Sequence, residues 1–188
     1  MQALLASYEK DDIVLRLGRL LAKHGWTFLG SAGTAKYLND NGISCRDVAE
    51  LVGKPILGHR VVTLSRELHA ALLSRKEDAS ELHALGIDPI DLVYVTLYPL
   101  EKTTANPSAT PEQVLEQTDM GGPALLRSAA KGRRLALSNP SQIEELEHRL
   151  TDGTLNDDSY RMSLAAAAER RVADYVETSA RYWEKRQP

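Results

Sequence analysis

Residues 91–98 read DLVYVTLY and form an almost continuously apolar run. The run is rich in β-branched and aromatic side chains, which are typical of a strand. A strand with one face in water alternates apolar and polar residues, whereas a strand covered by helices on both faces reads as an unbroken apolar run. This segment therefore predicts a strand buried on both faces of a parallel sheet.

The rest of the chain alternates between short apolar runs and segments with apolar residues at helical spacing. Further strands are expected at residues 2–6, 26–29, 44–48 and 135–138. Helices are expected at residues 11–24, 34–39, 78–85, 111–117, 121–131, 142–150 and 156–186. We expect residues 51–65 to be a loop with short helical pieces, residues 103–110 to be a loop, and residues 68–74 to be either helix or strand. This order predicts a single α/β domain spanning residues 1–188, with a mostly parallel sheet flanked by helices and a long C-terminal helix.

Two local patterns refine the last helices. Residues 141–144 read SQIE, which matches a capping box at a helix start. The apolar face of the last helix is predicted to consist of Leu164, Ala168, Val172, Tyr175, Val176 and Trp183.

Composition restricts the class of protein. The 188 residues are 43% hydrophobic and 26% charged, which is enough apolar material for a packed domain. The net charge of -3 argues against nucleic acid as a partner. The single cysteine, Cys45, is interpreted as a buried apolar residue, since it allows neither a disulfide framework nor a CxxC zinc site. No apolar run reaches the roughly 20 residues of a membrane span, so we expect a cytoplasmic protein.

Polar clusters follow several of the expected strands, at residues 7–11, 30–34, 96–102 and 119–122. Ligands of α/β sheets bind outside the carboxyl ends of the strands, so these clusters are predicted to form one site. The 30–34 segment (GSAGT) can cradle an anion with its backbone amides, or it can be a plain glycine turn with a threonine cap.

Each candidate residue also has a structural interpretation. Asp119 can be a helix cap, and Lys131 can be a cation at a helix end. Tyr98 and the proline after it can be a structural edge. Arg127, Arg133 and Arg134 are interpreted as solvated surface. The five histidines lack metal-ligand spacing, so no metal site is expected, and no GxSxG elbow is present.

Five strings, in order, resemble the IMP cyclohydrolase domain of the bifunctional AICAR transformylase/IMP cyclohydrolase family. They are residues 6–12 (ASYEKDD), 30–36 (GSAGTAK), 59–66 (HRVVTLSR), 96–100 (TLYPL) and 118–131 (TDMGGPALLRSAAK). The family's strings read SxSDKTG, STGGTAK, GRVKTLHP, NLYPF and IDIGGPALLRAAAK. The resemblance implies a methylglyoxal-synthase-like fold. The chain ends about where the transformylase domain of that enzyme begins, so we expect a divergent, standalone form.

The resemblance implies that Asp119, Lys131 and Tyr98 are catalytic. It implies substrate contacts from Lys10, Ser31, Gly33, Thr34, Arg60, Thr63, Thr96, Met120, Gly121 and Gly122. The chain departs from the family at Ala6, Tyr8, Gly30, Ala32, Val62 and Thr96. Most of these departures fall in strings that hold the nucleotide phosphate in the family, and Val62 stands in place of an active-site lysine. Phosphate binding is therefore predicted to be altered or weakened.

The implied function is cyclohydrolase-type ring closure of a formamido-carboxamide nucleotide or nucleoside, with loss of water and no cofactor. The substrate is a purine precursor, either in housekeeping IMP synthesis or in the biosynthesis of a purine-like nucleoside. The changed phosphate residues favour the specialised role. A homodimer and a separate formyl-transferring enzyme are candidate partners. The alternative is a catalytically impaired relative that binds or senses a purine nucleotide. A methylglyoxal synthase fits the TDMGGP and LYP strings less well.

Overall fold

The computed structural model describes residues 1–186. Five parallel strands form one sheet in the order β3-β2-β1-β4-β5. The strands are β1 (Gln2–Ser7), β2 (Thr27–Gly30), β3 (Arg46–Asp47), β4 (Leu92–Thr96) and β5 (Leu135–Leu137). The predicted fold class, an α/β fold with a parallel sheet flanked by helices, is confirmed.

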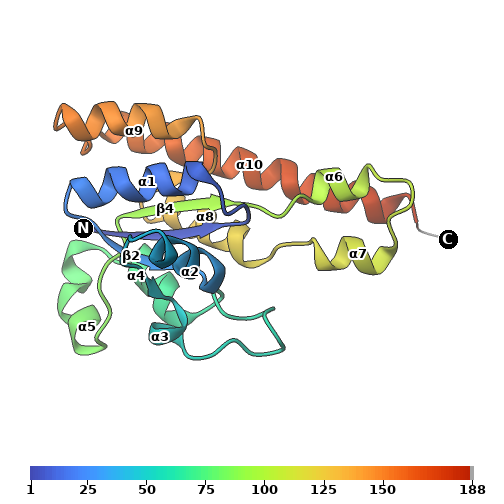
Figure 1. Ribbon diagram of the computed structural model, residues 1–188, viewed down its shortest axis with the longest axis horizontal. Helices are drawn as coiled ribbons and strands as arrows, with labels where there is room; N and C mark the ends of the chain where they lie inside the picture. Colours follow the sequence, from blue (N-terminus) through green and yellow to red (C-terminus); the bar gives the residue numbers. More distant parts are fainter. Residues whose placement is uncertain (187–188) are drawn as a thin grey trace.

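Ten α-helices and one 3-10 turn lie between and after these strands within the described residues. The helices are α1 (Asp12–Lys23), α2 (Ala32–Asp40), α3 (Ala49–Val52), α4 (Arg66–Leu73), α5 (Ala79–Ala84), α6 (Leu100–Thr104), α7 (Pro111–Glu116), α8 (Gly121–Lys131), α9 (Gln142–Thr151) and α10 (Asp158–Glu184), with the turn η1 at Lys76–Asp78. Figure 1 shows α1 and α9 on one side of the sheet, α4 and α5 on the other, and α10 running past the sheet to α6 and α7.

Strand β4 divides its side chains between two apolar cores. Leu92 and Tyr94 belong to the core under α1, α2 and α9. Val93 and Val95 belong to the core under α4, α8 and α10. All four are at most 1% exposed. This two-sided burial confirms the prediction from the unbroken apolar run, because each face of the strand packs against helices.

Some local predictions need correction. The segment 68–74, for which helix and strand were both open, is helical as far as Leu73. Helix α6 overlaps the start of the segment 103–110, which we expected to be a loop. Ser141 makes no side-chain cap, since its own backbone is already helical, with φ -62° and ψ -17°. The side chain of Gln142 accepts from the amides of Ser138 and Asn139. Val176 is 55% exposed. Tyr182 is buried instead, because it continues the helical spacing of Val172 and Tyr175. Within residues 1–186, no helix is both long and apolar enough to cross a membrane.

Candidate active site

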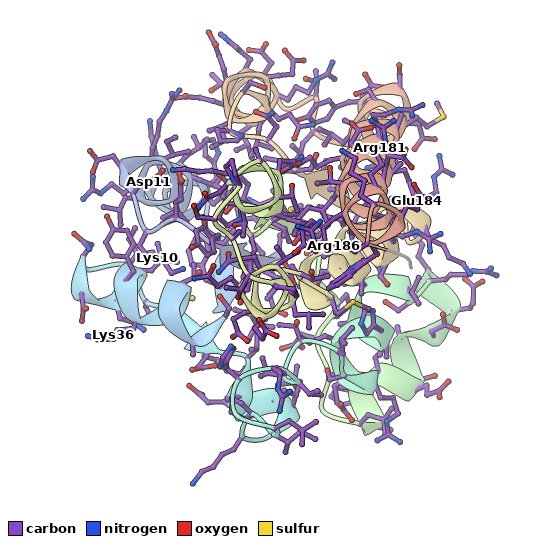
Figure 2. The ribbon with its side chains drawn as sticks, turned by 90° about the vertical axis from the view of Figure 1, so that its right-hand side faces the viewer. Lys10, Asp11, Lys36, Arg181, Glu184 and Arg186 are labelled. Atoms are coloured by element: carbon purple, nitrogen blue, oxygen red, sulfur yellow. The ribbon has the colours of Figure 1, made fainter. Side chains whose placement is uncertain are left out.

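A cavity of about 520 Å³ lies at the carboxyl ends of the strands β1, β2 and β4. Its walls come from the loop after β1, the start of α2, residues 55–63, the end of β4 and the start of α8. Figure 2 looks onto this end of the molecule, with Lys10 and Asp11 on one side and the end of α10 on the other. The predicted convergence of the four polar clusters is confirmed.

The cavity collects most of the candidate residues that the sequence suggested. It is lined by Lys10, Ser31, Gly33, Arg60, Thr63, Thr96, Tyr98, Asp119, Met120, Gly121 and Gly122. Thr34 and Lys131 are not among the lining residues. Ser7, Tyr8, His59, Val62 and Glu116 also line it.

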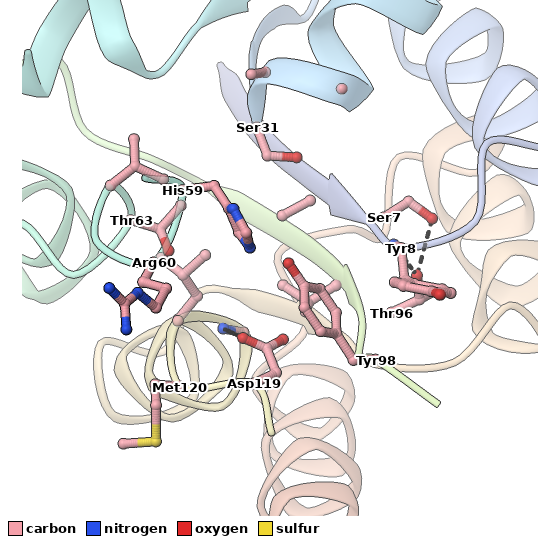
Figure 3. A pocket seen from close by; sticks show the side chains of 18 of the residues that line it. Ser7, Tyr8, Ser31, His59, Arg60, Thr63, Thr96, Tyr98, Asp119 and Met120 are labelled. Carbon is pink, nitrogen blue, oxygen red and sulfur yellow. Dashed lines mark hydrogen bonds between the residues drawn. The ribbon is translucent and has the colours of Figure 1, made fainter. Parts of the chain in front are cut away.

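Asp119 lies at the entrance to α8, with its carboxylate directed toward the cavity (Figure 3). Its Oδ1 accepts from the backbone N–H of Gly122 at 3.0 Å. Burial raises the pKa of Asp119, and the backbone amides of Gly122 and Gly121 oppose that effect. Asp119 is therefore both a helix cap and a desolvated carboxylate, and a desolvated carboxylate is a stronger base than a solvated one.

The two glycines at the start of α8 allow this close approach. A Cβ at Gly122 would overlap the Asp119 carboxylate and lie 2.7 Å from Leu97 Cδ2. A Cβ at Gly121 would overlap the Thr63 hydroxyl. The glycines were expected to admit a ligand. They also admit the site's own side chains, and the Gly122 amide is engaged by Asp119.

Tyr98 follows β4 and directs its hydroxyl into the cavity (Figure 3). Its ring packs on that of Tyr8, with 5.1 Å between centroids and 53° between planes. Burial, followed by the nearby charges of Asp119 and Glu116, raises the pKa of Tyr98. The phenol therefore keeps its proton at neutral pH and is available as a hydrogen-bond donor close to Asp119.

Hydroxyl groups form the part of the cavity near β1. The Ser7 and Thr96 hydroxyls are 2.9 Å apart, and Thr96 Oγ1 accepts from the Tyr8 amide at 2.7 Å. Ser31 Oγ donates to Thr34 Oγ1 at 3.0 Å. Thr34 is fully buried, and its Oγ1 accepts from the Ser7 amide at 3.1 Å. The Thr34 side chain therefore joins two loops beneath the cavity and is not among its lining residues.

Three basic side chains, those of Lys10, His59 and Arg60, line the cavity, and each has a partner within the protein. Lys10 lies over Gly33, and its ammonium donates to the carbonyls of Ser7 and Tyr8. Burial lowers the pKa of Lys10. Arg60 Nε donates to the Leu57 carbonyl at 3.0 Å. His59 Nε2 and Glu116 Oε1 lie 2.9 Å apart and join the 53–65 segment to α7.

Two other predicted residues lie away from the centre of the cavity. Met120 is 65% exposed, and its side chain extends away from the other labelled residues (Figure 3). Lys131 is exposed at the far end of α8. Ten residue steps of helix separate it from Gly121, a rise of about 15 Å. Within this chain, Lys131 therefore does not border the cavity that Asp119 lines.

This placement predicts that Lys131→Met leaves the rate of any reaction in the cavity within about twofold of the wild-type rate. The substitution keeps most of the side-chain length and removes a charge that does not border the cavity. Steady-state kinetics on the purified variant would check this. A large loss of kcat with an unchanged unfolding midpoint would contradict this prediction. It would indicate that Lys131 of one copy reaches the cavity of a second copy.

Among residues 1–186, no three His, Cys, Asp or Glu side chains are grouped so that they could hold a metal ion. The cavity offers a carboxylate, a phenol, hydroxyls and backbone amides, together with the cationic side chains of Lys10 and Arg60.

Comparison with known proteins shows which family this chain resembles in sequence and in structure. Residues 14–124 match the model of the MGS-like domain. The chain is 39% identical over 189 residues to the bifunctional purine biosynthesis protein PurH of Thermosynechococcus vestitus, covering 97% of this chain and 36% of the relative. It is 40% identical over 187 residues to the PurH protein of Synechococcus elongatus, covering 96% and 36%. The chain thus spans about a third of the length of these curated relatives.

A solved structure supports the assignment over the whole fold. The crystal structure of ForH superposes with a TM-score of 0.82 at 32% identity, covering 97% of this chain and 98% of that one. The shared fold, the matching family model and this identity together show that the chain belongs to the family of MGS-like domains.

Proposed function

We propose that this chain catalyses cyclohydrolase-type ring closure of a formamido-carboxamide nucleotide or nucleoside to a purine or purine analogue, with loss of water. The observation that carries the proposal is the desolvated carboxylate of Asp119, held at the start of α8 in the same cavity as Tyr98. Similarity to purine biosynthesis proteins named PurH supports a purine precursor as the substrate class.

The reaction needs a base and a partner for the oxygen of the electrophile. A carboxamide nitrogen attacks the neighbouring formamide carbon, and a carboxylate that accepts its proton makes the nitrogen a better nucleophile. Asp119 takes that role. The formyl oxygen gains negative charge as the bond forms, and the Tyr98 hydroxyl is placed to donate to it. Because both reacting groups belong to one molecule, holding them in the reactive conformation supplies much of the rate.

The remaining walls suit the rest of such a substrate. The Tyr8–Tyr98 pair offers an aromatic surface for a planar heterocycle. Ser7 and Ser31 offer hydroxyls beside the start of α2, and Lys10 brings a cation to the same corner. Arg60 supplies a second cation from the opposite wall. These groups can bind ribose hydroxyls or a phosphate, which is why both nucleotide and nucleoside substrates are proposed.

Val62 is the departure with the clearest consequence for phosphate binding. It lines the cavity and is partly buried against the core under α4 and α8. A charge-assisted contact is worth about 1.5–3 kcal/mol, which corresponds to about tenfold or more in affinity. Val62→Lys is therefore expected to tighten IMP binding by about tenfold, measured by calorimetry.

Two controls test whether the tighter binding comes from a contact between the new charge and the phosphate. Val62→Met lengthens the side chain without a charge and should leave the affinity for IMP within about threefold. Affinity for inosine, which lacks the phosphate, should be the same in all three proteins. Equal affinity of the wild type and Val62→Lys for IMP would show that residue 62 does not face the phosphate.

A second candidate function is a catalytically impaired relative that binds or senses a purine nucleotide. Val62 in place of a cation and the distance of Lys131 from Asp119 favour it, because fewer charges face the reacting groups. Measuring turnover and binding side by side separates the two functions. A sensor binds IMP but does not close the ring of either the formylated nucleotide or the nucleoside.

The cellular setting is part of the proposal. We place the protein in the cytoplasm, with no nucleic-acid or membrane partner. A separate formyl-transferring enzyme would supply the formamide substrate, and a homodimer is the proposed assembly. The retained carboxylate beside changed phosphate residues favours a role in specialised purine-like nucleoside biosynthesis.

A further inference from the structure

The loop that carries Asp119 is hydrogen-bonded to the long helix α10, which does not line the cavity. Tyr175, on α10, is 1% exposed. Its hydroxyl accepts from the backbone N–H of Asp119 at 2.8 Å and donates to the carbonyl oxygen of Gln117 at 2.6 Å. One hydroxyl therefore fixes both the amide of the candidate base and the carbonyl two residues before it.

The two sides of Asp119 are fixed by different elements. The carboxylate is held by the amide of Gly122 at the start of α8, and the main-chain amide is held by Tyr175. The Asp119 side chain has little freedom to rotate, because hydrogen bonds hold both its backbone amide and its carboxylate. Such restraint keeps a base within the narrow range of geometry that proton transfer requires.

Helix α10 contributes none of the cavity-lining residues in the described part of the chain, so its influence on the site is indirect. Arg171, one turn before Tyr175, pairs with Glu101 of α6, which follows Tyr98 closely in the chain. The same stretch of α10 thus contacts the segments that carry both Asp119 and Tyr98. Burial raises the pKa of Tyr175 to about 12, so its hydroxyl keeps the proton that it donates to Gln117.

We propose that Tyr175 is a positioning residue for the ring-closing reaction and that it acts through the backbone of Asp119. Helix α10 thereby helps to position the candidate base. The inference rests on the proposed function. It is carried by the geometry of a single hydroxyl, which Tyr175→Phe removes while the ring continues to fill its place in the core.

The same helix provides a matched control. Tyr160 is 5% exposed on α10, and its buried hydroxyl has no hydrogen-bond partner within residues 1–186. Tyr160→Phe therefore removes a hydroxyl from the same helix and a similarly buried position without releasing any loop. We expect Tyr175→Phe to lower kcat by about tenfold with KM within twofold, and Tyr160→Phe to leave both constants unchanged.

A second measurement keeps failure of this inference separate from failure of the proposed function. Hydrogen exchange of the Asp119 amide, followed by NMR, needs no turnover. Tyr175→Phe should speed that exchange by about tenfold or more, and Tyr160→Phe should not. Exchange that stays slow overturns the proposed hold on the loop. Fast exchange together with a wild-type kcat overturns the positioning role. An inactive wild type that shows the expected exchange difference places the failure in the proposed function.

Discussion

Asp119→Asn should lower the rate of ring closure by about 100-fold or more. Asparagine keeps the size of the side chain and an oxygen that can accept from the Gly122 amide, but it lacks a basic oxygen. The affinity for IMP, a product analogue, should stay within about threefold, because a base contributes mainly as charge moves in the transition state. Single-turnover kinetics and calorimetry measure the two quantities. A full rate in the variant would leave Asp119 as a helix cap only.

The raised pKa of Asp119 adds a test on pH and stability. A base must be deprotonated, so kcat should fall with decreasing pH at a pKa above that of an ordinary aspartate. Because the folded-state pKa is raised, protonation of this group stabilises the fold at low pH, and that contribution is lost as pH rises through the folded pKa. Asp119→Asn should therefore raise the unfolding midpoint at pH 7. A lower midpoint would contradict the desolvated carboxylate.

Gly122→Ala should lower turnover by about 100-fold. The new methyl group would overlap the Asp119 carboxylate and crowd Leu97, so the carboxylate has to leave its position at the helix start. Displacement of a reacting group by about 1 Å is enough for a loss of this size. Kinetics and thermal unfolding of the same preparation measure the loss of rate and the loss of stability together.

Gly132→Ala is the matched control at the other end of the same helix. Its methyl group would overlap the carbonyl of Leu72, away from the cavity. It should lower the unfolding midpoint but leave the rate per folded molecule unchanged below that midpoint. If both variants lose rate in proportion to stability, the Gly122 effect comes from the helix rather than from the carboxylate.

The features of the fold and the site that the sequence predicted share a physical basis. An unbroken apolar run can be buried only when both faces of the strand are covered, so residues 91–98 indicated the layers of the fold directly. Parallel strands bring their carboxyl ends to one edge, so the polar clusters after β1, β2 and β4 had to converge. Asp119, Tyr98 and Lys10 were found by this reasoning together with the family resemblance.

The parts that the sequence could not predict depend on tertiary distances. Lys131 matches the family string, but the string does not say that a straight helix carries its last residue about 15 Å from its first. Tyr175 was predicted only as a member of an apolar face. Its hydroxyl bonds to Asp119, which lies 56 positions earlier in the chain, and to Gln117, which lies 58 positions earlier. Local spacing in the sequence cannot reveal such contacts. The pairing of His59 with Glu116 is a long-range contact of the same kind.

Ring closure can be measured by incubating the purified chain with formylated aminocarboxamide ribonucleotide and, separately, with the corresponding ribonucleoside, and by following the product by mass and absorbance. We expect loss of one water from at least one of the two substrates, at a rate that Asp119→Asn lowers by about 100-fold or more. Tight binding of IMP without conversion of either substrate by the wild-type chain would contradict this expectation and establish a binding protein instead.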